Sequence, residues 1–300
     1  MFALQYHEYG GPEVTSLDEA PEPHAGPGQI RIKVAAASLN PIDVKLRSGR
    51  MAGGRPLAGV GRLGQDAAGV VDEVGEGVDG VVVGDDVFGL GSGAQAEYAV
   101  LRAWTAKPAS VDWSAAAAAS AAVETAERGL RLLGVKQGDT VFVDGGAGGV
   151  GAVVVQLAVA ANATVIASAS QDNHDYLREI GATPVLYGDG LVNRIRAVPD
   201  TTIDAVFDVA GKSPLTDLVA LVAEPSQVLS IANFEAPSVG ARVTSGGDDS
   251  RPEVALPLGA QLLADGRLVM QVETFPFDRF AEAYRIIESG HVRGKIVLVP

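Results

Sequence analysis

The hydrophobic residues between Thr140 and Val272 form short apolar runs that alternate with stretches of helix-forming residues. The run that starts at Thr140 is typical of a buried β-strand, and a glycine-rich turn and the helical stretch Ala152–Ala161 follow it. The later elements are expected as strands over Ala163–Ser168, Pro184–Leu186, Asp204–Val209, Gln227–Ile231 and Leu268–Val272, and as helices over Asp172–Ile180, Gly190–Ala197, Pro214–Ala223 and Pro257–Ala264. Strands that alternate with helices in this way predict an α/β fold with a doubly wound parallel sheet.

The first third of the chain has a different pattern, because its apolar runs are short and broken by glycine and proline. Strands are expected over Ile30–Ala36, Ala67–Val74, Val81–Leu90 and Ala94–Leu101, and helices from about Asp112, over Thr125–Leu133 and over Phe280–Ser289, before a last strand Lys295–Val299. We therefore predict a β-rich domain of residues 1–112 with 268–300, and a domain of residues 113–267 that contains the parallel sheet.

The turn after the strand at Thr140 contains three glycines, Gly146, Gly148 and Gly151, that fit the pattern G-x-G-x-x-G. Gly146 allows a tight turn, Gly148 lets a pyrophosphate approach the backbone, and Gly151 lets the helix pack closely on the strand. The positive end of the helix dipole favours bound phosphates. Together with the alternating strands, this loop predicts a Rossmann dinucleotide-binding domain.

The end of the second strand indicates which dinucleotide is bound. An acidic residue there would bind the ribose 2′-hydroxyl of NAD, but Ser168 occupies the position, about twenty residues beyond the glycines. Neutral donors follow, among them Ser170 and Asn173, and this favours NADPH as the cofactor. No lysine or arginine stands here, and Asp172 argues for NAD unless it caps the next helix, which is the preferred interpretation.

Composition narrows the classes of function. The chain of 300 residues has a formal net charge of −14 and no block of basic residues, so binding to nucleic acid or an anionic membrane is not expected. It contains no cysteine, which excludes disulfides and thiolate metal ligands and is consistent with a cytoplasmic protein. The four histidines, His7, His24, His174 and His291, lack the spacing of metal ligands.

Several separated segments, taken together and in order, resemble the zinc-independent quinone oxidoreductase branch of the medium-chain dehydrogenase/reductase superfamily. They are Ser38–Gly49 (N-P-x-D), Gly64–Val71 (G-x-D-x-A-G-x-V), Val83–Gly89 (G-D-x-V-x-G), Ala96–Tyr98 (A-E-Y), Asp144–Gly151 with Gln156–Ala158, and Gly294–Leu298 (G-K-x-V-L). The resemblance implies a GroES-like fold for the β-rich catalytic domain, a cleft between the two domains, and a homodimer.

The same resemblance implies a reaction without metal. Zinc alcohol dehydrogenases of this superfamily carry a cysteine where this chain has Asn40, and Gly-His-Glu where it has Gly64-Gln65-Asp66. A zinc site needs three protein ligands within reach, and these replacements remove the family's ligands. The expected reaction is therefore hydride transfer from NADPH to a quinone or an α,β-unsaturated carbonyl, both of which accept hydride as conjugated systems.

The resemblance also implies the site residues. Lys45 stands where quinone oxidoreductases often have a tyrosine, and a lysine at this position resembles the alkenal and enone reductase members instead. Lys45 is expected to donate to the developing enolate oxygen, with Asn40 beside it. Alternatively Lys45 is a solvated lysine or a partner of Asp43, and Asn40 is a loop residue that bonds the backbone. The cofactor contacts that the resemblance implies are Asn40, Thr125, Gly148, Gly149, Val150, Tyr187, Val209, Ala210, Ile231, Ala232, Phe234 and Lys295.

Some of these positions depart from the family pattern or have a second interpretation. The family's tyrosine stands one position after Tyr187, and Lys295 would alternatively pair with an acidic neighbour at the surface. Asp144 places a negative charge at the start of the phosphate loop, which weakens phosphate binding unless its side chain is turned away and hydrogen-bonded. Glu124 is expected as a solvated helix residue rather than an acid near the cleft.

Two other functions remain open at this point. A reductase of the same chemistry dedicated to one enoyl or polyketide intermediate would share every motif, because the pocket and not the fold sets the substrate. A non-catalytic NADPH-binding sensor would bind the cofactor without turnover on any acceptor.

Overall fold

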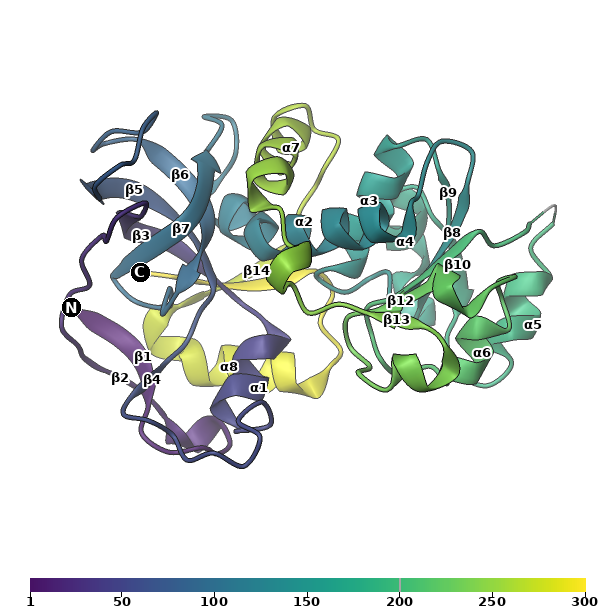
Figure 1. Cartoon of the computed structure of the whole chain (residues 1–300), viewed down its shortest axis with the longest axis horizontal. Helices are drawn as coiled ribbons and strands as arrows, with labels where there is room; N and C mark the ends of the chain where they lie inside the picture. Colours follow the sequence, from purple (N-terminus) through teal and green to yellow (C-terminus); the bar gives the residue numbers. More distant parts are fainter. Residues whose placement is uncertain (200) are drawn as a thin grey trace. The chain divides into compact units, whose positions relative to one another are not determined.

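A computed structural model describes residues 1–199 and 201–300 of the chain (Figure 1). The chain divides into two compact units, Met1–Ala121 with Pro252–Pro300, and Ala122–Arg251. The sequence-based limits at 112/113 and 267/268 instead assign residues 113–121 and 252–267 to the nucleotide-binding domain. These limits stay a prediction.

The first unit is β-rich. A small sheet has the strand order β2-β1-β4, and a larger sheet has the order β14-β15-β3-β5-β6-β7 with an additional pairing of β3 with β7. The strands are β1 (Phe2–Tyr6), β2 (Thr15–Glu19), β3 (Ile30–Leu39), β4 (Gly61–Arg62), β5 (Asp66–Val74), β6 (Asp86–Ser92), β7 (Tyr98–Ala106), β14 (Val272–Pro276) and β15 (Lys295–Val299). The pairing of β3 with β7 closes the ring β3-β5-β6-β7 around a core that includes Ile32, Val71 and Leu101.

A glycine permits the tight curvature of this sheet. An ideal Cβ on Gly69 of β5 would lie 2.1 Å from the carbonyl oxygen of Lys33 on β3, so no larger residue fits there. Helices α1 (Pro41–Arg47), α7 (Pro252–Ala264) and α8 (Phe280–Ser289) belong to the same unit. Strand β15 pairs antiparallel with β3, so the C-terminal tail lies beside the strand that leads into α1.

The second unit is built on a parallel sheet with the strand order β10-β9-β8-β11-β12-β13. Its strands are β8 (Thr140–Asp144), β9 (Thr164–Ala169), β10 (Thr183–Leu186), β11 (Ala205–Asp208), β12 (Val228–Ser230) and β13 (Arg242–Val243), and its helices are α3 (Gly151–Ala160), α4 (His174–Glu179), α5 (Leu191–Arg196) and α6 (Leu215–Val219). The order reverses at β8, and open sheets of this kind bind ligands beyond the carboxyl ends of the strands at such a point.

The sequence predicted the doubly wound sheet and the β-rich unit correctly, with errors in single elements. The strand expected over Leu268–Val272 is wrong as a member of the parallel sheet, because β14 begins at Val272 and pairs with β15. The parallel sheet instead ends in β13, whose two residues are too few to show a periodic pattern. The two helices expected from Asp112 onward are one continuous helix, α2 (Trp113–Leu133).

None of the helices in the described ranges 1–199 and 201–300 is long and apolar enough to cross a membrane.

Candidate active site and cofactor site

The glycine loop of the second unit has the geometry of a phosphate-binding turn. An ideal Cβ on Gly151 would lie 2.1 Å from the carbonyl oxygen of Gly145, and one on Gly146 would lie 2.6 Å from the Cβ of Ala167. Both positions therefore require glycine for packing. A Cβ on Gly148 would meet only the Gly145 oxygen, at 3.5 Å, so Gly148 faces open space beside Gly149 and Val150, before α3 begins. The turn leaves a cradle for a phosphate at a helix N-terminus.

Asp144, at the start of this loop, is turned into the protein. Its Oδ1 accepts a hydrogen bond of 2.5 Å from the Ser168 hydroxyl, which itself accepts from the Gly145 N–H at 2.9 Å. Burial raises the pKa of Asp144, and hydrogen bonds from Ser168 and Ser213 oppose that rise. The sequence analysis expected Asp144 to weaken phosphate binding unless its side chain is turned away and hydrogen-bonded. The structure shows that hydrogen-bonded arrangement.

Ser168 is 1% exposed, and its hydroxyl is engaged inside the loop. Its predicted contact with the cofactor ribose stays a prediction, although the structure gives the hydroxyl other partners. Ser170 and Asn173 lie after β9 and are joined by a hydrogen bond of 3.0 Å from Asn173 Nδ2 to Ser170 Oγ. Asn173, and not Asp172, occupies the N-cap position of α4, so the preferred interpretation of Asp172 as that cap is wrong.

The turns after β11 and β12 are held by the last residue of each strand. Asp208 accepts hydrogen bonds from the N–H groups of Ala210 and Gly211, at 3.1 and 2.7 Å. Ser230 donates to Asp208 at 2.7 Å and accepts from the N–H of Ala232 at 3.1 Å. Asp208 and Ser230 thereby fix the backbone at which Val209, Ala210, Ile231 and Ala232 were expected to meet the cofactor. Sequence reasoning gave neither residue a role, although each lies one position before the end of a predicted strand.

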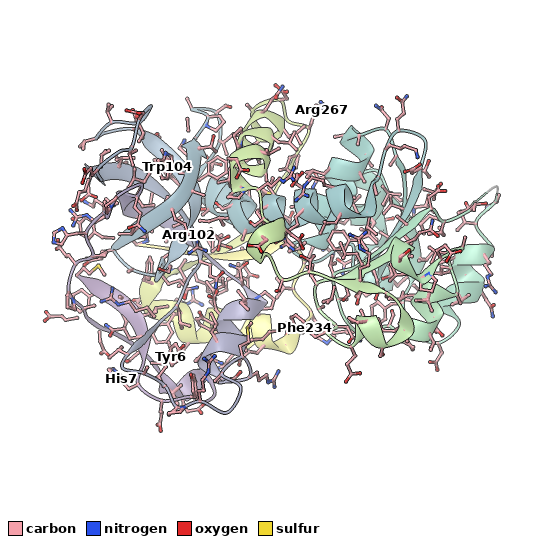
Figure 2. The ribbon with its side chains drawn as sticks, in the orientation of Figure 1. Tyr6, His7, Arg102, Trp104, Phe234 and Arg267 are labelled. Carbon is pink, nitrogen blue, oxygen red and sulfur yellow. The ribbon has the colours of Figure 1, made fainter. Side chains whose placement is uncertain are left out.

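Other predicted cofactor residues of this unit are exposed or lie beside a buried ion pair. Tyr187 is exposed, and Phe234, labelled in Figure 2, is 54% exposed. Thr125 accepts a hydrogen bond of 3.4 Å from Arg128, whose guanidinium also pairs with Glu124 at 3.0 Å. Glu124 is 6% exposed, so the expectation of a solvated helix residue is wrong.

A buried polar cluster of the first unit surrounds Asn40, which lies between β3 and α1. Asn40 Oδ1 accepts a hydrogen bond of 2.6 Å from Lys295 Nζ, and Asn40 Nδ2 donates one of 2.6 Å to Asp66 Oδ1. Lys295 lies 3.9 Å from Asp66 Oδ2 and is 5% exposed, which rules out the alternative of a surface ion pair. Because an ammonium can only donate and a carboxylate can only accept, these partners fix the orientation of the Asn40 amide.

Asp43 forms a second centre in the same cluster. It accepts hydrogen bonds from the N–H of Asn40 at 2.9 Å, from that of Gly64 at 3.1 Å and from Gln95 Nε2 at 3.3 Å. The hydroxyl of Tyr284 in turn donates to Gln95 at 2.7 Å. Three donors therefore engage Asp43, and it ties the backbone at Asn40 to that at Gly64.

Burial dominates the ionisation of this cluster. It raises the pKa of Asp43 to about 7, against the hydrogen bond from the Asn40 N–H and with the help of the nearby charge of Asp66. Burial also raises the pKa of Asp66, which Lys295 partly offsets, and lowers the pKa of Lys295, which Asp66 and Asp43 partly offset. One buried cation thus faces two buried carboxyl groups.

The structure brings together the predicted residues Asn40 and Lys295. It places Lys45, the other predicted catalytic residue, on α1, half-buried and one residue before Leu46. Sequence reasoning quoted Asp66 in a motif without giving it a role, and it missed Gln95 and Tyr284. Among the residues that the structure describes, no group of three or more His, Cys, Asp or Glu side chains is arranged to hold a metal ion.

Comparison with known proteins identifies families that both parts of the chain match. Residues 26–110 match the family described as alcohol dehydrogenase GroES-like domain, and residues 149–263 match the family described as zinc-binding dehydrogenase. The whole chain is 34% identical over 321 residues to the NADPH-dependent alkenal/one oxidoreductase of Arabidopsis thaliana chloroplasts, and the match covers 80% of that protein.

Solved structures agree with this comparison. The quinone oxidoreductase from Coxiella burnetii superposes with a TM-score of 0.86 at 30% identity and covers all of this chain and 99% of its own. A mycobacterial protein solved in complex with NADPH superposes with a TM-score of 0.85 at 25% identity, over the full length of both chains.

Proposed function

This chain belongs to the zinc-independent quinone oxidoreductase branch of the medium-chain dehydrogenase/reductase superfamily, and on this basis we propose that it reduces quinones or α,β-unsaturated carbonyls with NADPH. The relative from Arabidopsis is named for alkenal and alkenone reduction, and the Coxiella structure for quinone reduction. Both kinds of acceptor are conjugated carbonyl compounds, so they pose the same chemical task.

The glycine loop fits the proposed cofactor. Gly148 leaves the space that a pyrophosphate would fill, and Gly151 allows α3 to start directly behind it. We propose that Gly146, Gly148, Gly149, Val150 and Gly151 hold the pyrophosphate. Ser170 and Asn173 offer neutral donors near the end of β9, and position 168 carries a serine in place of a carboxylate. Both features favour a ribose that carries a 2′-phosphate. When bound, NADPH supplies the hydride.

The orientation of the Asn40 amide carries the proposal. Asp66 uses one of the two Nδ2 hydrogens, and the second is available to donate to a carbonyl oxygen on which negative charge develops. Lys295, hydrogen-bonded to the amide oxygen, strengthens that donor by polarising the amide. Asn40 stands at the position where zinc-dependent relatives have a cysteine ligand. A fixed amide would therefore polarise the carbonyl in place of the metal.

Lys45 is the second proposed donor to the acceptor oxygen. Its place on α1, five residues after Asn40, puts it on the helix that starts at the amide. A protonated amine would stabilise the negative charge on the oxygen, and a proton from an acid or from water would complete the reduction.

We also propose that the enzyme is a homodimer of the cytoplasm. The family resemblance supports a homodimer, and the lack of cysteine suits the reducing conditions of the cytoplasm.

Steady-state oxidation of NADPH tests the function, with NADH in parallel and a strong chelator present, against a panel of quinones and enones. We expect turnover that prefers NADPH and is indifferent to the chelator. Tight binding of NADPH without oxidation on any acceptor of the panel would contradict a general reductase. That result would favour a dedicated enoyl or polyketide substrate, or a sensor.

A further inference from the structure

The segment between Asp43 and Asp66 is basic in an otherwise acidic protein. Residues 44–65 contain no aspartate or glutamate, whereas the whole chain has a net charge of −14. The cationic residues of this segment are Lys45, Arg47, Arg50, Arg55 and Arg62. Arg47 is buried and pairs with Glu288, while Arg50, Arg55 and Arg62 are exposed. The segment therefore presents a locally positive surface to solvent.

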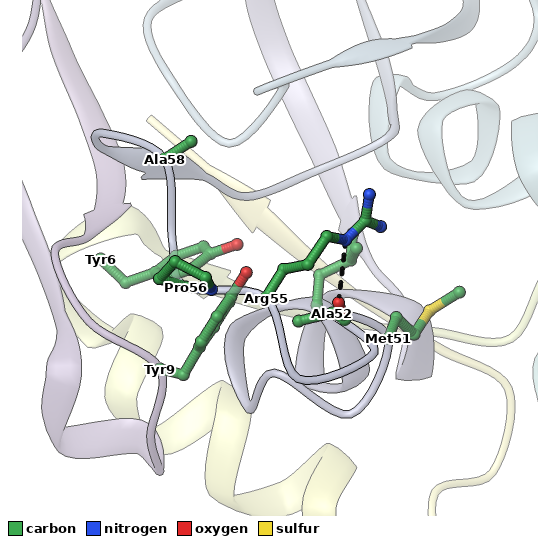
Figure 3. A pocket seen from close by; sticks show the side chains of 8 residues that line it. Tyr6, Tyr9, Met51, Ala52, Arg55, Pro56 and Ala58 are labelled. Carbon is green, nitrogen blue, oxygen red and sulfur yellow. Dashed lines mark hydrogen bonds between the residues drawn. The ribbon is translucent and has the colours of Figure 1, made fainter.

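A pocket of about 300 Å³ lies against this segment (Figure 3). Its walls come from β1 and the loop after it, from α1, and from the loop that follows α1. The lining side chains include Tyr6, Tyr9, Leu46, Met51, Arg55 and Pro56. This volume is at the small end of ligand pockets, which range from roughly 300 to 1,000 Å³, so it suits a compound built on one or two rings.

Two glycines hold the aromatic walls of the pocket in place. An ideal Cβ on Gly61 would lie 2.1 Å from Cζ of Tyr6, and one on Gly49 would lie 2.8 Å from Cγ of Tyr9. The backbone therefore rests directly on each ring. The ring centroids are 6.3 Å apart and the ring planes are tilted by 36°. Rigid, amphipathic rings of this kind bind planar apolar groups at a low entropic cost.

The polar groups of the pocket are hydrogen-bond donors. Arg55 Nε donates to the carbonyl oxygen of Ala52 at 3.1 Å, which ties the side chain to its own loop, drawn as a dashed line in Figure 3. Burial raises the pKa of Tyr6, with help from Tyr9 and Asp43, so its hydroxyl remains a donor. Asp43 itself is fully buried and engaged by three donors, so it leaves the pocket free of an exposed carboxylate from that side.

We propose that this pocket binds the carboxylate-bearing part of a conjugated acceptor, with the planar group packed against the two tyrosine rings and Leu46 and the carboxylate on Arg55. The inference rests on the proposed reductase function and adds the substrate class, acidic aryl enones or quinones. The guanidinium of Arg55 matches a carboxylate, and Met51 adapts its shape to the ring. Leu46 directly follows Lys45 on α1, so the pocket and the proposed donor share one short helix.

The test compares para-carboxybenzylideneacetone with its methyl ester, two enones that differ in one charge. We expect the wild-type enzyme to prefer the carboxylate in kcat/KM. Arg55→Gln should reduce the ratio of the two values by about two- to fivefold, since the arginine is exposed. Arg50→Gln is the matched control, because Arg50 is exposed on the same loop but does not line the pocket. It should leave the ratio within about twofold.

Two results would overturn the proposal. An unchanged ratio in Arg55→Gln overturns the proposal. A rise in KM for NADPH with both acceptors also overturns it, because the arginine would then serve the cofactor phosphates. If neither enone is reduced, binding of the carboxylate is measured by saturation-transfer NMR without NADPH, and the panel of quinones and enones decides the proposed function separately. Binding that Arg55→Gln abolishes keeps the pocket as a carboxylate site, and absence of binding by the wild type removes it.

Discussion

Lys295 Nζ donates a hydrogen bond of 2.6 Å to Asn40 Oδ1 across a sequence separation of 255 residues. The pairing of β15 with β3 brings the two side chains together, since Lys295 begins β15 and Asn40 directly follows β3. The last strand of the chain therefore sets the orientation of an amide that stands at the start of α1.

Replacing Lys295 tests whether this contact positions the amide. Lys295→Met removes the donor to Asn40 and leaves Asp66 without its cation, so we expect kcat to fall by about tenfold or more, by loss of a polarised donor. Because burial lowers the pKa of Lys295, the decline of kcat at alkaline pH should be present in the wild type and absent in Lys295→Met.

Two further variants separate positioning from general damage. Lys295→Arg keeps a cation and should restore part of kcat, and Lys33→Met removes an exposed lysine from β3 without effect. A Lys295→Met enzyme with normal kcat and an unchanged pH profile would show that the contact only stabilises the fold.

Lys45→Ala tests the second proposed donor. Loss of a donor to the charged acceptor oxygen should lower kcat by about tenfold or more, while the Kd for NADPH measured by fluorescence stays the same. The same Lys33→Met variant serves as the control. If kcat is unchanged, Lys45 has no part in the reaction, and Asn40 alone remains as the proposed donor.

Gly148→Ala tests the phosphate cradle without a packing defect. A methyl group there meets only the Gly145 oxygen at 3.5 Å, so the melting temperature should be unaffected. It would, however, fill the space assigned to the pyrophosphate, and we expect the Kd for NADPH to rise by about tenfold or more. Titration of NADPH fluorescence measures it. An unchanged Kd would place the phosphates elsewhere.

Ser168→Ala distinguishes a cofactor contact from a structural one. The substitution removes a hydrogen bond from buried Asp144 and an acceptor from the Gly145 N–H, so unfolding should become easier by about 1–3 kcal/mol. The preference for NADPH over NADH should stay within about twofold, because the hydroxyl is engaged inside the loop. A larger change in preference would establish contact of Ser168 with the ribose.

The pH dependence of stability tests the environment of Asp43. Its pKa is about 7 in the folded protein, against about 3.9 in an unfolded chain. Between these values the folded state holds a proton that the unfolded state has released. The free energy of unfolding should therefore fall as pH rises, by up to about 1.4 kcal/mol per pH unit, and this contribution is fully present below about pH 4 and lost above about pH 7.

Asp43→Asn removes this titration, so its stability should fall less between pH 4 and 7 than that of the wild type, as measured by urea unfolding at each pH. Asp79→Asn changes an exposed aspartate and should follow the wild type. Parallel curves for the wild type and Asp43→Asn would mean that Asp43 is ionised throughout this range.

The fold was predictable where the sequence carries a strong local pattern. The loop of Gly146, Gly148 and Gly151 follows an apolar strand and precedes an apolar helix, so its place in a doubly wound sheet could be inferred before its geometry was known. Strand β13 could not be inferred, because its two residues show no periodicity and pair only through the sheet.

The polar cluster shows the same limit for the site. Asn40 and Lys295 were predicted separately from short motifs, but their direct contact depends on the pairing of strands far apart in the sequence. The roles of Asp66, Gln95 and Tyr284 follow from that same packing. A buried ion pair such as Glu124 with Arg128 is also invisible in the sequence, because four-residue spacing fits a solvated helix face equally well.

The most direct test uses NADPH that carries deuterium at the hydride-donating carbon of the nicotinamide, with an enone acceptor and chelator present. The account predicts oxidation of NADPH and deuterium on the β-carbon of the reduced product, located by NMR. Deuterium on the carbonyl carbon, or no oxidation with any quinone or enone despite tight NADPH binding, would contradict it.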